Sequence, residues 1–475
     1  MPNLGANAER GVFANRTLNL RSVPVIGYDM DYTLIHYNSA EWESVAFDYA
    51  KVALKQKGFP VDGFVFDPSK FTVGLVFDLE LGSLLKATRF GRVVRAQHGN
   101  ELLSFEQQRR TYSSTIVELS SPRFRFMNTL FELSRASLFT QLVHVHDRQP
   151  LLGINSYGDL YNVVDSALEA AHNGGSLKAE IVADKERFID LDRDVVATLK
   201  DQRLAGKKLV LITNSDWAYT SEMMPYCFDR FIEGNETWRS LFDLVIVSAN
   251  KPRFFIESDP IYRVVDEDES LLLPHVGPLE PGHVYFGGNA RLVEERFDLA
   301  GEEALYVGDH LFGDVHVSKD VLSWRTALIA RELESEIADA IDFAPDQARL
   351  EAMMADKVEV DRAQAQLRLA RAAGGGRDVQ VAYSKVTTEA TKLDEQIAPL
   401  ARAAGELGNP IWGPLMRAGN DKSLFARQVE RYADVYASRV SNFRAETPYA
   451  YLRAARGSLP HDLAQYTDAG GPQER

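Results

Sequence analysis

The segment VIGYDMDYTL, residues 25–34, joins a short apolar run to two aspartates and a threonine. The run has the length and composition of a buried strand, and it stops at Asp29-Met30-Asp31. Two carboxylates this close repel each other and resist burial. A bound cation or phosphate group offsets that cost, so the segment predicts a site for one or both.

The composition of the whole chain sets broad limits on its class. The 475 residues are 45% apolar and 25% charged, which is ordinary for a globular protein of two or three domains. The formal net charge of -15 argues against a nucleic-acid partner, because nucleic-acid binders present basic surfaces. A local basic pocket for a small anion remains compatible with this charge.

Three sequence features favour a cytoplasmic location. Cys227 is the only cysteine, so no intrachain disulfide can form. The first twenty residues lack the basic start and apolar run of a signal peptide. No apolar run approaches the roughly 20 residues that span a bilayer, so we expect no membrane partner.

Short apolar runs alternate with helix-like segments along much of the chain. The strand-like runs are residues 23–28, 208–212, 244–247 and 305–307. Helix-like segments such as 192–204 and 290–299 lie between them. This alternation predicts an α/β fold with a Rossmann-like parallel sheet. Ligands of such sheets bind beyond the carboxyl ends of the strands, so we expect the four polar tails to converge.

The spacing of these runs predicts an inserted region and a separate C-terminal region. Roughly 180 residues separate the first two strands, far more than one crossover helix needs. After about residue 332 the sequence becomes charge-rich and helical, with a breaker at Gly374-Gly375-Gly376. The expected domains are a core of 1–50 and 190–345, a cap of 51–189, and a helical region of 346–475 with a disordered tail at 467–475.

Residues with phosphate chemistry follow the strands. Asp29 can attack phosphorus if a cation and backbone N–H groups hold the phosphate against it. Asp31 is placed to act as general acid and base. Hydroxyl and amide groups in Thr213-Asn214-Ser215 suit phosphate oxygens, and Lys251 offsets negative charge.

The fourth strand supplies further carboxylates. Asp309 and Asp314 in YVGDHLFGD form an oxygen-rich set with Asp29, which suits Mg²⁺ as the cofactor. Each motif is weak alone, because D-x-D is common in solvated turns and TNS often starts a helix. Their occurrence in this order, each at a strand end, favours a phosphate site.

The order D-x-D-x-T, T-N-S, K and GD-x(4)-D resembles the haloacid dehalogenase (HAD) superfamily of phosphohydrolases. GYDMDYTL, LITNSD, YVGDHLFGDV and LFARQVERYADVYAS are further similar to the cytosolic purine 5'-nucleotidase family of the IMP/GMP-preferring type, over residues 12–462. The resemblance implies a HAD-type core with a cap and Mg²⁺-dependent hydrolysis of nucleoside 5'-monophosphates. The substrate would therefore be a small-molecule nucleotide. It also allows phosphoryl transfer to a second nucleoside and implies a homo-oligomer, a dimer or tetramer.

The resemblance also implies a role for each motif residue. Asp29 would be the phosphorylated nucleophile and a metal ligand, and Asp31 the acid/base whose backbone carbonyl binds the metal. Lys251 would steady the phosphoaspartate. The remaining roles are phosphate binding by Thr213 and Asn214 with Ser215 beside them, metal binding by Asp309, and support by Asp314.

The cap departs from the family pattern. After His98-Gly99 the family has Phe-Asn near the base, whereas this chain has Asn100-Glu101. By spacing from the GSLK motif, Asp165 takes the place of a family arginine and Glu169 that of an aspartate. The tentative substrate-binding residues are therefore Glu169, His172, which can stack on a base, and Lys178, which can reach phosphate. His172 at an exposed helix end is the alternative.

Two other patterns have structural explanations. His144 and His146 would share one face of a strand, but a cap-surface or core role is favoured over a metal site. The helical spacing of Phe425, Tyr432, Tyr436 and Phe443 indicates core packing.

Two alternatives to the nucleotidase remain open. One is a HAD phosphatase acting on another small phosphate monoester. The other is a catalytically idle nucleotide-binding regulatory protein, against which the intact motif set speaks.

Overall fold

The computed structural model describes residues 8–173 and 175–457, with only the backbone of residues 172 and 173. Its centre is a ten-stranded sheet in the order β1-β20-β17-β16-β3-β11-β12-β15-β13-β14. The strands from β20 to β15 run parallel, and the outer pairings at both edges are antiparallel. Their bounds are β1 Val12–Ala14, β20 Val435–Ala437, β17 Arg325–Ile329, β16 Ala304–Gly308, β3 Val25–Tyr28, β11 Lys208–Ile212, β12 Leu244–Val247, β15 Val284–Gly287, β13 Ile261–Asp266 and β14 Leu271–Pro274.

The central strands are apolar throughout because helices cover both sides of the sheet. All residues of β3 and β12 are buried, as expected for parallel strands. Helix α7 (Arg193–Leu204) packs on β11, and α11 (Val317–Leu322) packs on β17. The predicted α/β class is confirmed, and the other helices of this region are α8 Trp217–Phe228 and α10 Ala290–Phe297.

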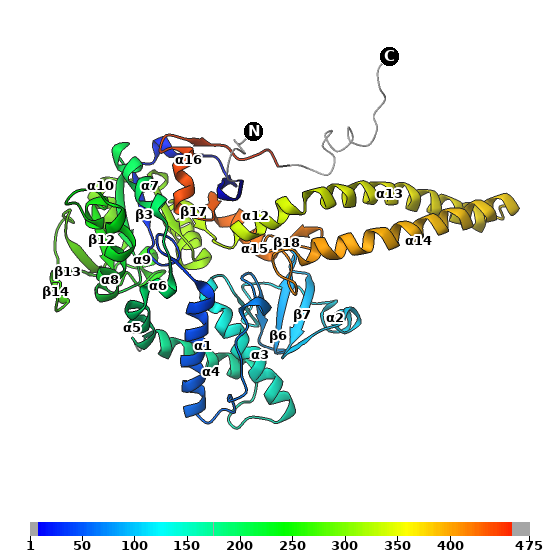
Figure 1. The fold of residues 1–475 in the computed structure, drawn as a ribbon, viewed down its shortest axis with the longest axis horizontal. Helices are drawn as coiled ribbons and strands as arrows, with labels where there is room; N and C mark the ends of the chain where they lie inside the picture. Colours follow the sequence, from blue (N-terminus) through cyan, green and yellow to red (C-terminus); the bar gives the residue numbers. More distant parts are fainter. Residues whose placement is uncertain (1–7, 174, 458–475) are drawn as a thin grey trace, which may run out of the picture.

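The inserted cap lies on one side of the core (Figure 1). Helices α1 (Ser39–Gln56), α3 (Leu133–Arg148) and α4 (Tyr157–Asn173) pack on one another, and α3 also packs on a five-stranded antiparallel sheet. His144 and His146 therefore lie on a helix, where they do not share a face. The sheet consists of β5 Val76–Asp78, β6 Ser83–Ala87, β7 Val93–His98, β8 Glu101–Leu102 and β9 Phe124–Phe126, with α2 Phe105–Tyr112 beside it.

The chain leaves and re-enters the core through a short two-stranded sheet. Strand β4 (His36–Tyr37) pairs antiparallel with β10 (Ile189–Asp190). Helix α1 begins at Ser39 directly after β4, with the Asn38 side chain accepting from the Glu41 N–H. The expected boundary at residue 50 falls inside α1, whose contacts with α3 and α4 place it with the cap.

A long helical hairpin extends away from the body of the protein (Figure 1). It consists of α13 (Ala344–Ala372) and α14 (Arg377–Glu406), which pack on each other after the shorter α12 (Leu333–Asp342). The glycine breaker at 374–376 forms the turn between the two long helices, as the sequence indicates. None of the described helices is long and apolar enough to cross a membrane.

The last part of the chain returns to the core and adds a strand to the central sheet. Phe425 and Tyr432 lie on α15 (Leu424–Tyr432), but Tyr436 lies on β20 and Phe443 begins α16 (Phe443–Glu446). The expected helical spacing of the aromatic series is therefore wrong beyond Tyr432, whereas its packing role is confirmed for the buried rings of Phe425, Tyr432 and Phe443. The expected tail at 467–475 lies outside the described residues.

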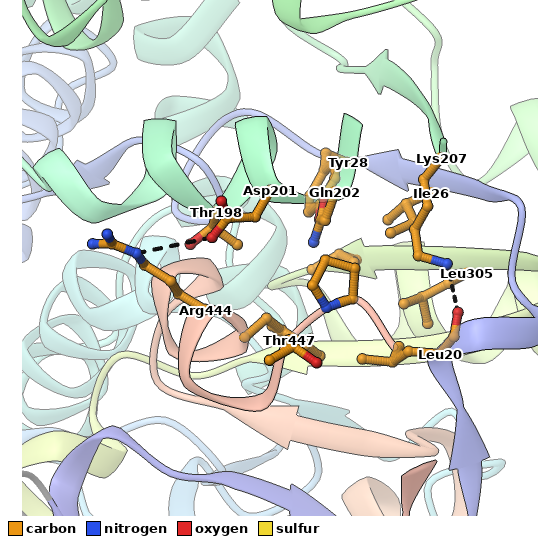
Figure 2. A pocket seen from close by; sticks show the side chains of 13 residues that line it. Leu20, Ile26, Tyr28, Thr198, Asp201, Gln202, Lys207, Leu305, Arg444 and Thr447 are labelled. Carbon is orange, nitrogen blue, oxygen red and sulfur yellow. Dashed lines mark hydrogen bonds and ion pairs between the residues drawn. The ribbon is translucent and has the colours of Figure 1, made fainter. Parts of the chain in front are cut away.

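Helix α16 joins the C-terminal segment to the core (Figure 2). Arg444 Nε lies 4.0 Å from Asp201 Oδ2 on α7, and Tyr28 Oη donates to Gln202 Oε1 at 2.7 Å. Lys207 Nζ donates to the backbone carbonyl of Leu20 at 2.5 Å. The crevice between these side chains has a volume of about 10 Å³, which is room for about one water. It is therefore part of the packing between α16 and the core and is too small for a ligand.

Candidate active site

The carboxyl ends of four adjacent parallel strands open into one cavity. Asp29 follows β3, Thr213 follows β11, Lys251 lies beyond β12, and Asp309 follows β16. The cavity has a volume of about 430 Å³. Its lining includes the predicted residues Asp29, Asp31, Lys178, Thr213, Asn214, Lys251, Asp309 and Asp314, together with Trp42, Thr129, Phe131, Glu132 and Arg135.

Three carboxylates meet within the cavity. Asp29, Asp309 and Asp314 each offer an oxygen, and these atoms lie within 4.8 Å of one another. Burial and the neighbouring charge of Asp314 raise the pKa of Asp29 to about 7, although Lys251 opposes the shift. Burial and the Asp29 charge raise the pKa of Asp309 well above its usual value. This dense set of hard oxygen donors fits a divalent cation such as Mg²⁺, whose charge removes the repulsion.

Lys251 is the cation within this cluster. Its Nζ lies 2.8 Å from Asp29 Oδ1 and 2.9 Å from Asp314 Oδ1, and it donates to Tyr306 Oη at 2.9 Å. Burial opposes its charge, but the two carboxylates outweigh burial and raise the pKa of Lys251 well above its usual value. Lys251 therefore stays an ammonium between two acids.

The Asn214 side chain positions the loop that carries Lys251. Its Oδ1 accepts from the Lys251 backbone N–H at 2.6 Å, and its Nδ2 donates to the Lys251 carbonyl at 3.1 Å. Both ends of the amide are thus engaged by the Lys251 backbone. Thr213, fully buried beside it, accepts from the Ser215 N–H at 3.0 Å through Oγ1.

Two hydroxyl groups orient the carboxylate of Asp31. Ser215 Oγ donates to Asp31 Oδ2 at 2.7 Å, and Tyr37 Oη donates to Asp31 Oδ1 at 2.5 Å. Tyr37 in turn lies 3.1 Å from the hydroxyl of Tyr219. Sequence reasoning missed Tyr37, because a tyrosine six residues downstream on a separate strand carries no recognisable spacing.

A glycine permits the close approach of Asp314. A Cβ atom at Gly308, the last residue of β16, would lie 2.5 Å from Asp314 Oδ2. The His310 backbone N–H donates to the same oxygen at 3.3 Å. The glycine of the GDHLFGD motif is therefore required by the position of a carboxylate, and not by an unusual φ.

The predicted cap residues differ in whether they reach the cavity. Lys178, on α5 (Ser176–Ala183), reaches the core: its Nζ donates to Ser215 Oγ at 3.3 Å and lies 3.4 Å from Asp216 Oδ2. Glu169 is exposed on α4 and does not line the cavity. His172 lies on the same helix, but its side chain is outside the described part of the structure.

The departures at Asn100 and Glu101 lie away from the strand-end cavity. Asn100 lines a separate cap cavity of about 310 Å³ with Phe71 and Gln97, and Glu101 is exposed on β8. Asp165 does not line the strand-end cavity either, but its Oδ1 lies 2.7 Å from Arg135 Nη2. A guanidinium thus stands next to the position where the resemblance expects an arginine.

Sequence reasoning also missed the cap residues that line the cavity. Trp42 comes from α1, Phe131 and Glu132 from the turn before α3, and Arg135 from α3 itself. A Glu and an Arg three residues apart are common in helices, so this spacing carries no functional signal. Among the described residues, the only His, Cys, Asp and Glu group that could hold a metal is Asp29, Asp309 and Asp314, so His144 and His146 have no metal-site support.

Comparison with known proteins decides the family. The model of the 5' nucleotidase family matches residues 12–464. The chain belongs to the 5' nucleotidase family. A 5'-nucleotidase domain-containing protein of Dictyostelium discoideum is 26% identical over 465 residues, which cover 95% of this chain and 75% of that protein. This 5' nucleotidase family member is a phosphoric monoester hydrolase.

Two solved structures overlap with this 5' nucleotidase family member in part. An archaeal β-phosphoglucomutase from Pyrococcus sp. strain ST 04 is 11% identical, with a TM-score of 0.31. The matched part covers 64% of this chain and 86% of the phosphoglucomutase chain. A predicted phosphoglycolate phosphatase from Haemophilus somnus 129PT is 12% identical with a TM-score of 0.28, covering 65% and 85%.

Proposed function

We propose that this protein is a Mg²⁺-dependent 5'-nucleotidase that hydrolyses nucleoside 5'-monophosphates, with a preference for purines, through an aspartyl-phosphate intermediate. The observation that carries the proposal is the position of Asp29, which lies beside Lys251 and within one cation-sized group with Asp309 and Asp314. Membership of the 5' nucleotidase family supports the substrate class.

The first chemical step transfers the phosphoryl group to the protein. An oxygen of Asp29 attacks phosphorus, the bond from phosphorus to the nucleoside O5' breaks, and protonated Asp31 gives its proton to O5'. Ser215 and Tyr37 hold the Asp31 carboxyl in place through their hydroxyl groups. The nucleoside leaves and an aspartyl phosphate remains.

The second step regenerates Asp29. Asp31, now ionised, takes a proton from a water as its oxygen attacks phosphorus, and the bond between phosphorus and Asp29 breaks. The product is inorganic phosphate. Asp29 is again a free carboxylate, and Asp31 is again protonated. Acceptance of the phosphoryl group by a second nucleoside in place of water would give the transferase activity that the resemblance allows.

The charged groups at the strand ends fit these steps. Asp29, Asp309 and Asp314, with the backbone carbonyl of Asp31, would hold Mg²⁺, which supplies positive charge to the phosphate oxygens. The Lys251 ammonium favours the ionised form of Asp29, which is the form that acts as a nucleophile. Thr213 and Asn214, which line the cavity, would bind the remaining phosphate oxygens, with Ser215 beside them.

The cavity is large enough for a substrate with a leaving group beyond its phosphate. Its volume of about 430 Å³ falls in the range of small-molecule sites. We further infer a core, a cap that begins with α1 and ends before β10 and that selects the leaving group, and a C-terminal helical region after about residue 345. We also propose that the protein forms a homo-oligomer in the cytoplasm.

A panel of phosphate esters tests this function. The purified protein should release phosphate from IMP and GMP with Mg²⁺ and not with EDTA. Faster turnover of ribose 5-phosphate than of every nucleotide would eliminate the nucleotidase and favour a phosphatase for another small ester. The Asp29→Asn variant is the control: unchanged phosphate release would trace the activity to a contaminant and favour the idle binding protein.

A further inference from the structure

A small crevice shares two of its residues with the strand-end cavity. Its volume is about 20 Å³, and its lining includes Tyr32, Asn128, Thr129, Asp309 and Glu332. Thr129 and Asp309 also line the strand-end cavity, so they separate the two spaces. No step of the proposed reaction uses the crevice. A group bound in it would nevertheless lie against Asp309, a predicted ligand of the cation.

Tyr32 brings an unpaired polar group to this crevice. The Tyr32 side chain is 3% exposed, and its Oη has no hydrogen-bond partner among the described residues. The centre of its ring lies 5.2 Å from that of Tyr37 and 6.3 Å from that of Trp42, so the ring is held by packing. A buried hydroxyl without a partner is unfavourable, so a bound group is expected beside it.

The backbone of Tyr32 is also unusual. Its φ is 55°, in the left-handed region that a bulky residue rarely adopts. Such a conformation costs free energy and persists where the surrounding structure requires it. Tyr32 directly follows Asp31 in the D-x-D-x-T motif. The backbone and the hydroxyl therefore both point to a role beyond ring packing.

A loop of the cap brings a second unpaired group to the crevice. Asn128 Oδ1 is buried and has no hydrogen-bond partner among the residues that the structure describes. The next residue, Thr129, donates through Oγ1 to Asp309 Oδ2 at 3.4 Å. The cap loop thus contacts the predicted cation ligand and lines the crevice with an unpaired acceptor.

These groups match the hydrogen-bonding capacity of one water. The crevice exceeds the roughly 10–15 Å³ that a water requires. Burial and the charges of Glu43 and Asp309 raise the pKa of Tyr32 well above its usual value, so its hydroxyl stays a donor. A water accepts from Tyr32 and donates to Asn128 Oδ1 and Asp309. A monovalent cation between Asp309 and Glu332 is less suitable, because the divalent cation nearby would repel it.

We propose that the crevice holds one bound water, through which Tyr32 and Asn128 orient the Asp309 carboxylate toward the cation. Tyr32 and Asn128 are positioning residues, because they act on the reaction only through Asp309. The inference rests on the cation site of the proposed function. It also makes the cap a contributor to cation binding, through Asn128 and Thr129.

Tyr32→Phe tests the inference, because it removes the hydroxyl and keeps the ring. The measurement is the dissociation constant of Mn²⁺ for the purified protein without substrate, from the electron paramagnetic resonance signal of free Mn²⁺. It should rise about 10-fold, as when a group that orients a metal ligand is removed. With GMP as substrate, kcat at saturating Mg²⁺ should fall by a smaller factor than the affinity for the cation.

Tyr28→Phe is the matched control. Tyr28 is also buried, on β3, but its hydroxyl donates to Gln202 and it does not line the crevice. The Mn²⁺ dissociation constant of Tyr28→Phe should equal that of the wild type. An equal rise in Tyr28→Phe and Tyr32→Phe would trace the effect to packing and overturn the inference.

Asn128→Ala keeps the test valid if Tyr32→Phe does not fold, which a thermal melt will show. It removes the acceptor from the other side of the crevice and should also raise the Mn²⁺ dissociation constant. A crystal structure with Mg²⁺ should show the water within hydrogen-bond distance of Tyr32 Oη and Asp309. Unchanged Mn²⁺ binding in the variants would overturn the inference, as would Mn²⁺ binding that requires K⁺, since the occupant would then be a cation.

The titration also separates failure of this inference from failure of the proposed function, because it needs no substrate. A wild-type protein that binds Mn²⁺ but hydrolyses no nucleotide would overturn the nucleotidase and leave the role of Tyr32 standing. A wild-type protein that hydrolyses GMP and whose Tyr32→Phe variant binds Mn²⁺ equally well would do the reverse.

Discussion

The strand-end half of the cavity and the cap half are assembled in different ways. Each strand-end residue lies a few positions after a buried parallel strand, so a short motif specifies both the side chain and its place, as for Asp29 and Asp309. The cap residues Trp42, Phe131 and Arg135 come from three separate elements and share no motif. The groups at the strand ends can therefore be recognised from sequence, whereas the groups of the cap depend on how the cap folds.

The largest expected effect tests the strand-end half. Asp29→Asn removes the nucleophile, because an amide does not attack phosphorus at a useful rate. We expect phosphate release to fall by about 10⁴-fold or more. The control is Asn100→Ala in the cap, assayed in parallel. A fall of less than about tenfold would contradict Asp29 as the nucleophile, and no fall at all would trace the activity to a contaminant.

Removing Lys251 should cost stability as well as activity. Lys251→Met leaves the buried carboxylates of Asp29 and Asp314 without their cation. We expect a loss of about 3–5 kcal/mol in the free energy of unfolding without divalent cations, measured by urea denaturation. Added Mg²⁺ should restore part of this loss. A variant as stable as the wild type in EDTA would mean that the acids are protonated in the folded state.

A methyl group at Gly308 should weaken the cation site. Gly308→Ala places a Cβ atom against Asp314 Oδ2, so the carboxylate must move. We expect the Mg²⁺ concentration for half-maximal activity to rise about 10- to 100-fold. Gly313→Ala, whose Cβ would meet the His310 ring instead, is a comparison within the same motif. An unchanged Mg²⁺ requirement would argue against Asp314 as a support for the cation.

The two-stranded sheet of β4 and β10, which connects the core and the cap, should lose stability in acid. His36 on β4 is buried, and neither ring nitrogen has a hydrogen-bond partner among the described residues. Burial, with a smaller contribution from Arg439, lowers the pKa of His36 to about 3. As pH falls below about 6.5, the unfolded chain binds a proton that the folded protein does not, so stability is lost.

Replacing His36 should remove this acid sensitivity. The stability of His36→Leu relative to the wild type should increase by about 1.6 kcal/mol between pH 6.5 and pH 5. Urea denaturation of both proteins at the two pH values gives the difference. A constant difference would mean that His36 is protonated in the folded state.

The smallest expected effect concerns Asn100. Because Asn100 lines a separate cavity, Asn100→Phe, which restores the residue that the resemblance expects, should change kcat/KM for GMP by less than about twofold. A fall of about tenfold or more would mean that the cap closes over substrate differently from the structure described.

The fold was predictable where local sequence and final environment agree. The strand at 244–247 coincides with β12, because a parallel strand buried on both faces is a continuous apolar run. Strand β20 was missed because three residues between two helical segments carry too little pattern to distinguish strand from helix. Only pairing with β17 makes Tyr436 part of a sheet.

The amino-acid sequence by itself determined the α/β class, the 5' nucleotidase family and the identity of the strand-end residues, since each lies within a few positions of its own strand. Only the tertiary structure decided that Tyr37 holds Asp31, that Asn100 lines another cavity, and that Arg135 lines the strand-end cavity. The physical reason is sequence separation. A motif contains residues that are near neighbours in the chain, whereas the cap side of the cavity forms from elements that are distant in the chain and whose relative positions are set by packing.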